Sequence, residues 1–361
     1  MKTRTFFQRL ETMTLLSASL VACQPKQEQE VTPTKYTLDD FSVKEIPSSN
    51  ATVISPDSMV LSSPSDLSLI YDSILVMPST RTTDNALWLL NVKNKEYRKA
   101  LTIGNGPSEV NELKYLWKTG NTLHACDKTG KVLTIEVNPA DLSTHVSKEA
   151  NLEVNLYALC TMSDGNYLTC GREDRYHIVD RHDSLLAKTG VFPVNEVPSG
   201  DRITYMNFSV EMKASPNLDH IVCANHKWNK IEIYDAKGKL KHWLDGPIDV
   251  TSDIVTHQIP NTPVSFVMIE PNYTFFRCAH TSDKGFMVSY DGTEFVPRSG
   301  QRSVGYNNIL TFDWSGRPQQ IYHFEQPFWN FAYDDKTKTF YMVIETNDEY
   351  KIIQYTNLPL K

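Results

Sequence analysis

Apolar and polar positions alternate along this chain in a unit that recurs six times. Each unit has an apolar stretch with β-branched and aromatic residues, a polar turn and a second apolar stretch. The turns centre on Asp72, Gly120, Gly165, Asn217, Asp283 and Asp335. Successive centres lie 48, 45, 52, 66 and 52 residues apart. Because a four-stranded propeller blade has about this length, the pattern predicts an all-β, six-bladed β-propeller.

A second set of turns divides each unit further. Asn, Asp, Gly and Lys recur between the third and fourth apolar stretches, as in Asn94-Lys95, His182-Asp183 and Ser315-Gly316. These residue types adopt turn conformations at low cost. We therefore expect four antiparallel strands in each of the first five blades.

The last unit holds only three strand-like stretches, over 328–333, 339–345 and 350–355. The stretch 41–46, near the start of the chain, is also strand-like and belongs to no unit. A propeller avoids an exposed edge when a strand from one terminus completes the blade formed by the other. We expect 41–46 to pair with 350–355 and close the ring.

The start of the chain is typical of a targeting signal rather than of a folded element. Basic residues precede a mostly apolar run over 13–22, which is shorter than the roughly 20 residues that a membrane-spanning helix needs. The run ends in Leu20-Val21-Ala22-Cys23, which resembles the lipobox of bacterial lipoproteins. In such proteins the cysteine carries the lipid and begins the mature chain. The alternative is an ordinary signal peptide followed by a chance cysteine.

These features divide the chain into three parts. We expect a lipoprotein signal peptide over 1–22, a lipidated Cys23 with a flexible tether over 23–35, and the propeller over 36–361. The tether is rich in Gln, Glu, Lys, Pro and Thr, so it has little apolar surface to bury. No later segment approaches the roughly 18 consecutive apolar residues of a membrane span, and the lipid would be the only membrane attachment.

Two stretches resemble a known family. Ile103-Gly104-Asn105-Gly106-Pro107-Ser108-Glu109 lies between the first two blades, and Phe312-Asp313-Trp314-Ser315-Gly316-Arg317-Pro318 lies near the end. With the repeat, they resemble the TolB-like six-bladed propeller lipoproteins of Gram-negative bacteria over roughly residues 36 to 358. The resemblance implies the fold and a cell-envelope location, with a lipid anchor in the outer membrane. It implies no chemistry, and it leaves open which side of that membrane the propeller faces.

Charge and cysteine content narrow the function classes. The formal net charge is −7, without the basic excess typical of a nucleic-acid binder. Apart from Cys23 the chain has five cysteines, of which Cys160 and Cys170 lie symmetrically about Gly165. These two either face each other or are buried free thiols, and the second interpretation is favoured because cysteine packs well as a small hydrophobe. We expect a monomer without a cofactor.

Alternating strands send alternate loops to opposite faces of the ring. Loops between second and third strands share one face with the loops that join blades, and both long insertions, 245–262 and 291–308, fall on that face. Arginines gather there, together with an aromatic side chain. Arginine forks and aromatic rings suit an anionic, carbohydrate or peptide ligand, although charged loops occur on most protein surfaces. The candidate ligand-binding residues are Arg81, Glu109, Arg172, Arg175, Arg202, His226, Trp228, Arg298, Arg302 and Tyr306.

The sequence favours a binding or scaffold protein over an enzyme. It has no His-Glu-x-x-His, Gly-x-Ser-x-Gly or Cys-x-x-Cys motif. The alternative is a metal-assisted hydrolase or lyase with a site in the central channel. Glu109, Asn207 and Asn330 lie near the ends of central strands, and some six-bladed propellers hold Ca²⁺ with such residues. Glu109 also lies beside Gly104 and Gly106, which we expect to form a tight inter-blade turn.

Overall fold

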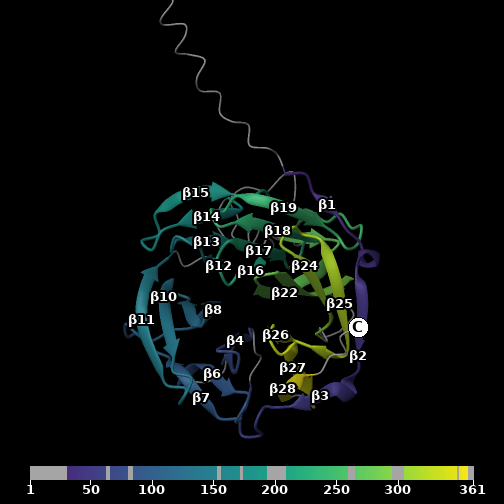
Figure 1. Ribbon diagram of the computed structural model, residues 1–361. Helices are drawn as coiled ribbons and strands as arrows, with labels where there is room; N and C mark the ends of the chain where they lie inside the picture. Colours follow the sequence, from purple (N-terminus) through teal and green to yellow (C-terminus); the bar gives the residue numbers. More distant parts are fainter. Residues whose placement is uncertain are drawn as a thin grey trace, which may run out of the picture. The chain divides into compact units, whose positions relative to one another are not determined.

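Six four-stranded antiparallel sheets surround a central axis, as the sequence predicts (Figure 1). The structure is a computed structural model. It describes residues 31–61, 66–79, 84–152, 156–170, 174–192, 209–258, 265–294, 305–347 and 349–356. Residues 33–361 form one compact unit, separate from residues 1–32. The prediction of an all-β, six-bladed propeller is confirmed.

The first three blades follow one another along the chain, each running from the centre of the ring outward. Blade one has β4 (Ser68–Ile70), β5 (Ile74–Pro78), β6 (Asn85–Asn91) and β7 (Tyr97–Thr102). Blade two has β8 (Leu113–Thr119), β9 (Thr122–Asp127), β10 (Lys131–Val137) and β11 (Thr144–Asn151). Blade three has β12 (Ala158–Thr161), β13 (Tyr167–Cys170), β14 (Tyr176–Val179) and β15 (Leu185–Thr189).

The remaining blades have the same order of strands. Blade four has β16 (Val210–Ala214), β17 (His220–Asn225), β18 (Lys230–Asp235) and β19 (Leu240–Asp245). Blade five has β22 (Tyr273–Ser282), β23 (Gly285–Glu294), β24 (Tyr306–Asp313) and β25 (Pro318–Phe328). Blade six has β26 (Asn330–Asp334), β27 (Thr339–Thr346) and β28 (Glu349–Tyr355).

The ring closes through an N-terminal strand, but not through the expected one. β3 (Ala51–Val53) pairs antiparallel with β28 and completes blade six. The stretch expected to do so forms β2 (Ser42–Ile46), which pairs parallel with β25 of blade five. The pairing of 41–46 with 350–355 is therefore wrong. Alternation of side chains reveals a strand, but it reveals neither its partner nor its direction.

The N-terminal segment 34–53, which we call the strap, lies along the rim of three successive blades (Figure 1). β1 (Thr34–Lys35) pairs parallel with β19, and the 3₁₀ turns η1 (Leu38–Asp40) and η2 (Ser48–Asn50) separate it from β2 and β3. Tyr36, Phe41 and Ile46 turn inward and are buried in the clusters of blades four to six. The strap thus covers strand edges and adds apolar side chains to the core.

The core consists of apolar layers between neighbouring blades. Side chains on each face of a blade pack against the next blade, which is why the strands carry near-continuous apolar runs such as 74–78. The five cysteines at 126, 160, 170, 223 and 278 are buried here as free thiols. Cys160 lies opposite Leu168, and Cys170 lies opposite Ala158, in the β12–β13 ladder. The interpretation as buried free thiols is confirmed.

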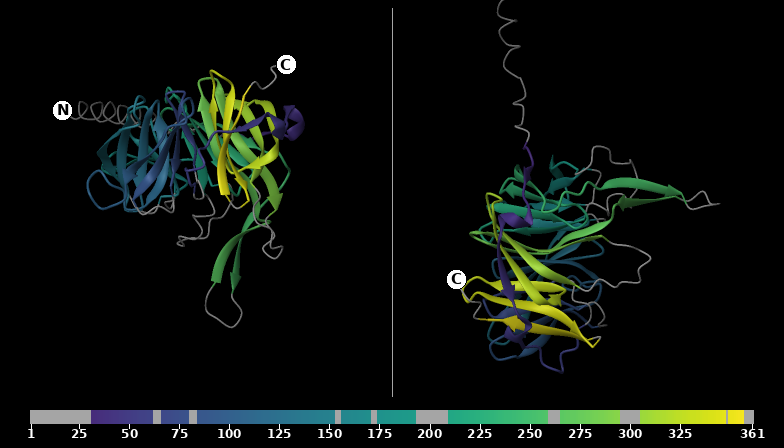
Figure 2. Two further views of the ribbon diagram at one scale, coloured as in Figure 1. Left: turned by 90° about the horizontal axis from the view of Figure 1, so that it is seen from below. Right: turned by 90° about the vertical axis from the view of Figure 1, so that its right-hand side faces the viewer.

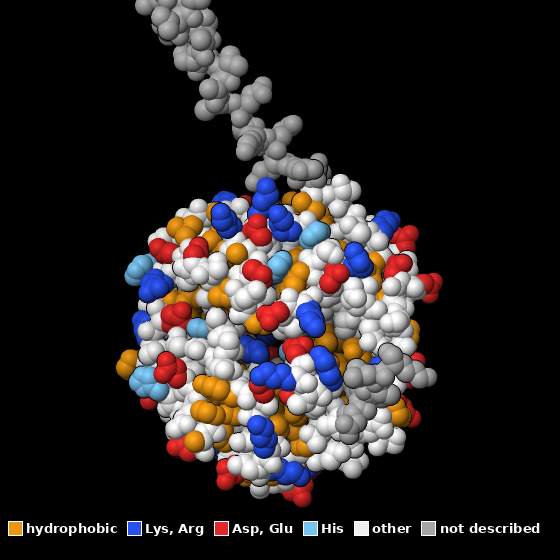
Figure 3. Space-filling model, viewed as in Figure 1, with side chains coloured by type: hydrophobic (Ala, Val, Ile, Leu, Met, Phe, Trp, Pro, Cys, Tyr) orange, Lys and Arg blue, Asp and Glu red, His pale blue; other side chains and the backbone are white. Residues whose placement is uncertain are grey.

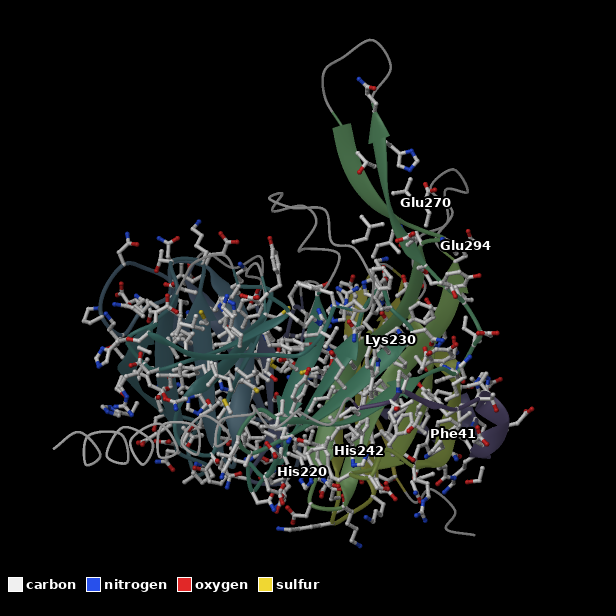
Figure 4. The ribbon with its side chains drawn as sticks, turned by 90° about the horizontal axis from the view of Figure 1, so that it is seen from above. Phe41, His220, Lys230, His242, Glu270 and Glu294 are labelled. Atoms are coloured by element: carbon white, nitrogen blue, oxygen red, sulfur yellow. The ribbon has the colours of Figure 1, made fainter. Side chains whose placement is uncertain are left out.

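The insertion after blade four forms a hairpin that stands out from the ring. β20 (Asp253–Gln258) and β21 (Ser265–Glu270) pair with each other in a separate two-stranded sheet, which projects from one face (Figure 2). Glu270 and Glu294, at strand ends, lie toward this face, whereas His220 and His242 lie toward the opposite one (Figure 4). We call the side with the hairpin the hairpin face.

Candidate functional site

The first strands of the blades line the centre of the ring, and a cavity of about 210 Å³ lies among them. It is bounded by the first strands β8, β12, β16 and β22, by Asp66 just before β4, and by Pro78 at the end of β5 and His226 from the loop after β17. The loops that lead into first strands and those between second and third strands lie on one face of the ring. The cavity is therefore the mouth of the central channel on the hairpin face.

A lysine held by two carboxylates forms one side of this cavity. The Lys213 ammonium lies 3.2 Å from the Asp66 carboxylate and 3.2 Å from the Glu211 carboxylate. Burial raises the pKa of Glu211 to about 7, against the opposing influence of Lys213. Burial lowers the pKa of Lys213, but the two carboxylates outweigh it and hold that pKa above its usual value. The charge of Lys213 is thus neutralised within the protein.

Arg277 from β22 contributes a second cation with a different environment. Its side chain lines the cavity and lies near the Tyr306 phenol, whose pKa its charge lowers against the larger effect of burial. No carboxylate lies within ion-pair distance of its guanidinium in the part of the chain that the structure describes. Burial raises the pKa of Tyr306, so the phenol stays neutral beside the arginine. Arg277 is therefore a cation whose donors are mostly available to the cavity.

His226 lies at the same wall. Its Nδ1 is 3.2 Å from the Ser209 hydroxyl, while its buried Nε2 has no hydrogen-bond partner among the described residues. Burial, and then the charges of Arg277 and Lys227, lower the pKa of His226 to about 3. The imidazole is therefore neutral at physiological pH, and a buried polar atom is left unsatisfied at the edge of the cavity.

Lys114 forms the wall on the side of blades two and three. Its ammonium donates a hydrogen bond to the Leu156 carbonyl at 2.8 Å, and it lies 5.3 Å and 5.8 Å from the ring centres of Tyr115 and Tyr157. The described lining of the cavity thus has three cations, Lys114, Lys213 and Arg277, against the carboxylates of Asp66 and Glu211. The excess of positive charge makes the site attractive to an anion.

The other end of the channel is narrower. A cavity of about 60 Å³ lies there, beside Lys118, Lys213 and His280. Lys118 donates to the Leu69 carbonyl at 2.7 Å, and burial, followed by the charge of Lys213, lowers its pKa. Basic and acidic side chains surround the hollow at the centre of this face (Figure 3). The larger opening is therefore the one on the hairpin face.

A family model described as TolB-like 6-blade propeller-like matches residues 40–336. The chain belongs to this family. The match spans five complete blades and reaches blade six, in agreement with the ring of six blades around the channel.

Several solved structures are similar to this chain at low sequence identity. A streptogramin B lyase is 8% identical, with 85% of this chain and 97% of that chain covered and a TM-score of 0.46. A luciferin-regenerating enzyme is 8% identical, with 84% and 94% covered and a TM-score of 0.45. Hydrazine synthase of Kuenenia stuttgartiensis is 13% identical, with 81% and 75% covered and a TM-score of 0.42. A comparison with curated proteins found no match.

The structure describes some of the candidate ligand-binding residues of this TolB-like propeller, and brings only some of those to the cavity. Glu109, Arg175, His226, Trp228 and Tyr306 are described by the structure, and of these His226 lines the cavity while Tyr306 contacts Arg277. The others lie outside the described residues. These are Cys23, Arg81, Arg172, Arg202, Arg298 and Arg302, and also Asn207.

Arg175 is buried rather than displayed on a loop. Its guanidinium donates to Asn225 at 2.5 Å and lies 3.2 Å from the Glu232 carboxylate, which also accepts a hydrogen bond from Tyr176. The guanidinium also lies over the Tyr176 ring, 4.6 Å from its centre. This network joins blade three to blade four, so the chemistry of Arg175 is used inside the protein.

Trp228 and Glu109 also have internal contacts. Trp228 is 2% exposed and packs with Ile269 and Ile254 at the base of the projecting hairpin, so it offers no aromatic surface to solvent. The Glu109 carboxylate accepts a hydrogen bond from the Gly106 amide at 2.8 Å. A Cβ on Gly104 would lie 2.1 Å from the same carboxylate, so a larger residue there would displace Glu109 from this turn. Glu109 thus supports the inter-blade turn.

The described residues show neither a cluster of metal ligands nor a membrane-spanning helix. Among the described residues, no group of three or more His, Cys, Asp or Glu side chains is placed to hold a metal ion. Asn330 is buried and accepts a hydrogen bond from the Phe331 amide. Likewise, no helix within the described ranges is long and apolar enough to cross a membrane.

The sequence interpretation missed the charged residues of the first strands. Lys213 and Arg277 each interrupt an apolar stretch, in Val-Glu-Met-Lys-Ala and Phe-Phe-Arg-Cys-Ala. A charged residue in the innermost strand faces either the channel or the apolar layer between blades. Because an apolar layer excludes an unpaired charge, such interruptions were the available signal.

Proposed function

We propose that this protein is a lipid-anchored binding module of the cell envelope that takes a small anionic ligand, or the anionic group of a larger one, on its hairpin face. The family supplies the propeller. The anchor would be the lipid on Cys23, since the sequence there resembles a lipobox. The ligand would be a small molecule, carbohydrate or peptide, and the site would be the mouth of the central channel.

One observation carries this proposal. The cavity on the hairpin face gathers charged side chains from blades one, two, four and five around a single opening, with cations in excess. Side chains on inner strands of a closed ring are held more rigidly than side chains on loops. A concave site with a few converging polar groups is the usual form of a small-molecule site.

Binding can be tested with panels of small anions, neutral and acidic sugars, and short peptides, measured by thermal shift. We expect at least one anionic class to raise the melting temperature, because a ligand stabilises the state that binds it. Lys114→Glu should weaken this effect, whereas Lys93→Glu, on an exposed turn of the outer rim, should leave it unchanged. The proposal would be contradicted if no member of the panels raised the melting temperature. It would also be contradicted if Lys114→Glu, Lys93→Glu and a variant lacking Arg298 and Arg302 all bound the ligand equally well.

The anchor has its own test. Cys23→Ala should move the protein from the membrane fraction to the soluble fraction, because a single residue would carry all the acyl chains. A Cys23→Ala protein that still pellets completely with membranes would rule out the lipid anchor without affecting the proposed binding site.

A further inference from the structure

The cavity at the channel mouth contains one guanidinium that no described carboxylate neutralises. Arg277 has five donors in a planar fork, and the neutral Tyr306 phenol lies near it. Lys213, by contrast, is held between two carboxylates at 3.2 Å each. A cation that faces a cavity without a partner ion is suited to hold an anion from outside.

We propose that the cavity binds the carboxylate of a small organic acid, with Arg277 as its anchor. This inference rests on the proposed function, namely that the channel mouth on the hairpin face binds a ligand. It adds the chemical class of the ligand and the residue that recognises it.

The neighbouring carboxylates favour an anion with a single charge. Asp66 and Glu211 line the same cavity as Arg277, and the guanidinium lies close enough to Glu211 to oppose the rise in the pKa of that carboxyl that burial causes. A dianion such as phosphate would meet these carboxylates with twice the charge. One unneutralised arginine matches one carboxylate, and its fork can donate two parallel hydrogen bonds to it.

His226 offers a second contact beside Arg277. If the Ser209 hydroxyl donates to Nδ1, the neutral imidazole carries its proton on Nε2. That nitrogen has no partner in the part of the chain that the structure describes, although buried polar atoms are rarely left unsatisfied. A ligand oxygen at the wall of the cavity would accept this proton in a hydrogen bond. Tyr306 is a positioning residue, since it acts on the ligand through Arg277.

The cavity has room for a small organic acid. Its volume of about 210 Å³ is many times what a single water molecule needs. The same carboxylate could belong to a free acid, to a uronic acid or to the C-terminus of a short peptide, of which only the end would enter the cavity.

The experiment is titration calorimetry on the full-length protein. The probes are free C3 to C6 monocarboxylic acids, a uronic acid and a short peptide, each beside its primary amide, together with inorganic phosphate. We expect at least one carboxylate to bind and its amide to bind at least tenfold more weakly, because the amide lacks the charge. The probe that binds identifies the source of the carboxylate.

Substitution of Arg277 provides a second test. Arg277→Gln should weaken the binding of that carboxylate about tenfold to a hundredfold, the usual effect of losing a charge-assisted pair. Arg277→Lys should restore the charge but not the fork, and should give an intermediate affinity. Arg317→Gln is the matched control, since Arg317 lies on an outer turn of the same blade and is 77% exposed. Circular dichroism and the melting temperature would verify that each variant is folded.

The outcomes separate the two proposals. If phosphate or a neutral sugar binds best, or if carboxylate binding survives Arg277→Gln unchanged, the carboxylate inference is overturned while the binding function stands. If no probe binds and Lys114→Glu has no effect on any ligand class, both fail.

Discussion

Ring closure by β3 can be tested at Ile54, the residue that follows this strand. Ile54 is 3% exposed and packs in the cluster between blades six and one. Its amide donates to the Ile352 carbonyl at 2.9 Å, and the neighbouring Ser55 hydroxyl accepts from the Ile352 amide at 3.1 Å. Ile54→Ala therefore perturbs the closing contact directly and leaves the rest of the strap in place.

The expected loss can be worked from the buried side chain. The substitution removes three carbon atoms, which accounts for about 2.4 kcal/mol of transfer free energy at roughly 0.8 kcal/mol each. The cavity left behind adds to this, so a total of about 3 kcal/mol is expected. For a domain of this size, 1 kcal/mol corresponds to about 1.5 °C in melting temperature, which gives a decrease of about 4–5 °C.

The assay is chemical and thermal unfolding of Ile54→Ala beside Thr52→Ala. Thr52 lies in β3 itself, but its side chain is exposed, so this control should change stability by less than about 0.5 kcal/mol. Equal stabilities of the two variants would refute closure at this strand. A truncation through residue 46 could destabilise the protein as much as Ile54→Ala does. This result would not support pairing of 41–46 with 350–355, because β2 pairs with β25 of blade five.

Three further predictions concern single side chains. Burial opposes ionisation of Glu149, but hydrogen bonds from His124 and Thr134 outweigh it and lower its pKa to about 2. The wild type should therefore lose up to about 3 kcal/mol of unfolding free energy as the pH falls from 4.5 to 2. Glu149→Gln should show a flatter dependence of stability on pH in that range. Because burial raises the pKa of Glu211 to about 7, the folded state holds a proton between pH 4.5 and 7 that the unfolded state releases. The free energy of unfolding should therefore fall as the pH rises from 4.5 to 7. Glu211→Gln should remove this pH dependence in denaturant titrations. Trp228→Ala should cost about 3–5 kcal/mol of stability in equilibrium unfolding because the indole is buried, and a variant as stable as wild type would show that the ring is not packed at the hairpin base.

Local features of the fold could be read from the sequence because they depend on neighbouring residues. The turns at Asp72, Gly120 and Gly165 all have positive φ, at 53°, 61° and 79°, where Asp and Gly are tolerated. The apolar stretches on either side became paired strands within a few residues of the expected bounds. Spacing between turns then determined the number of blades.

Pairings between distant segments could not be read in the same way. β2 and β3 both lie in the first 53 residues, and nothing in their composition distinguishes a strand for blade five from a strand for blade six. The choice depends on the distance that the chain covers around the rim and on which edges are already paired. Similarly, Trp228 follows a polar stretch that suggests an exposed loop. Its burial depends on contacts with Ile254 and Ile269 at the base of the inserted hairpin.

The candidate site lies on the inner strands rather than on the loops, where the sequence predicts it. In a propeller, the innermost strands supply side chains to a channel whose walls the ring keeps in place. A charged residue there must be neutralised by its neighbours, face solvent or await a ligand. Lys213 is neutralised by its neighbours, since two carboxylates lie 3.2 Å from its ammonium. Among the described residues, no carboxylate lies within ion-pair distance of Arg277, and its neighbour Tyr306 is a neutral phenol. The contrast between these two cations, in one cavity and on neighbouring blades, is the physical reason to look for the ligand in the channel before looking for it on the loops.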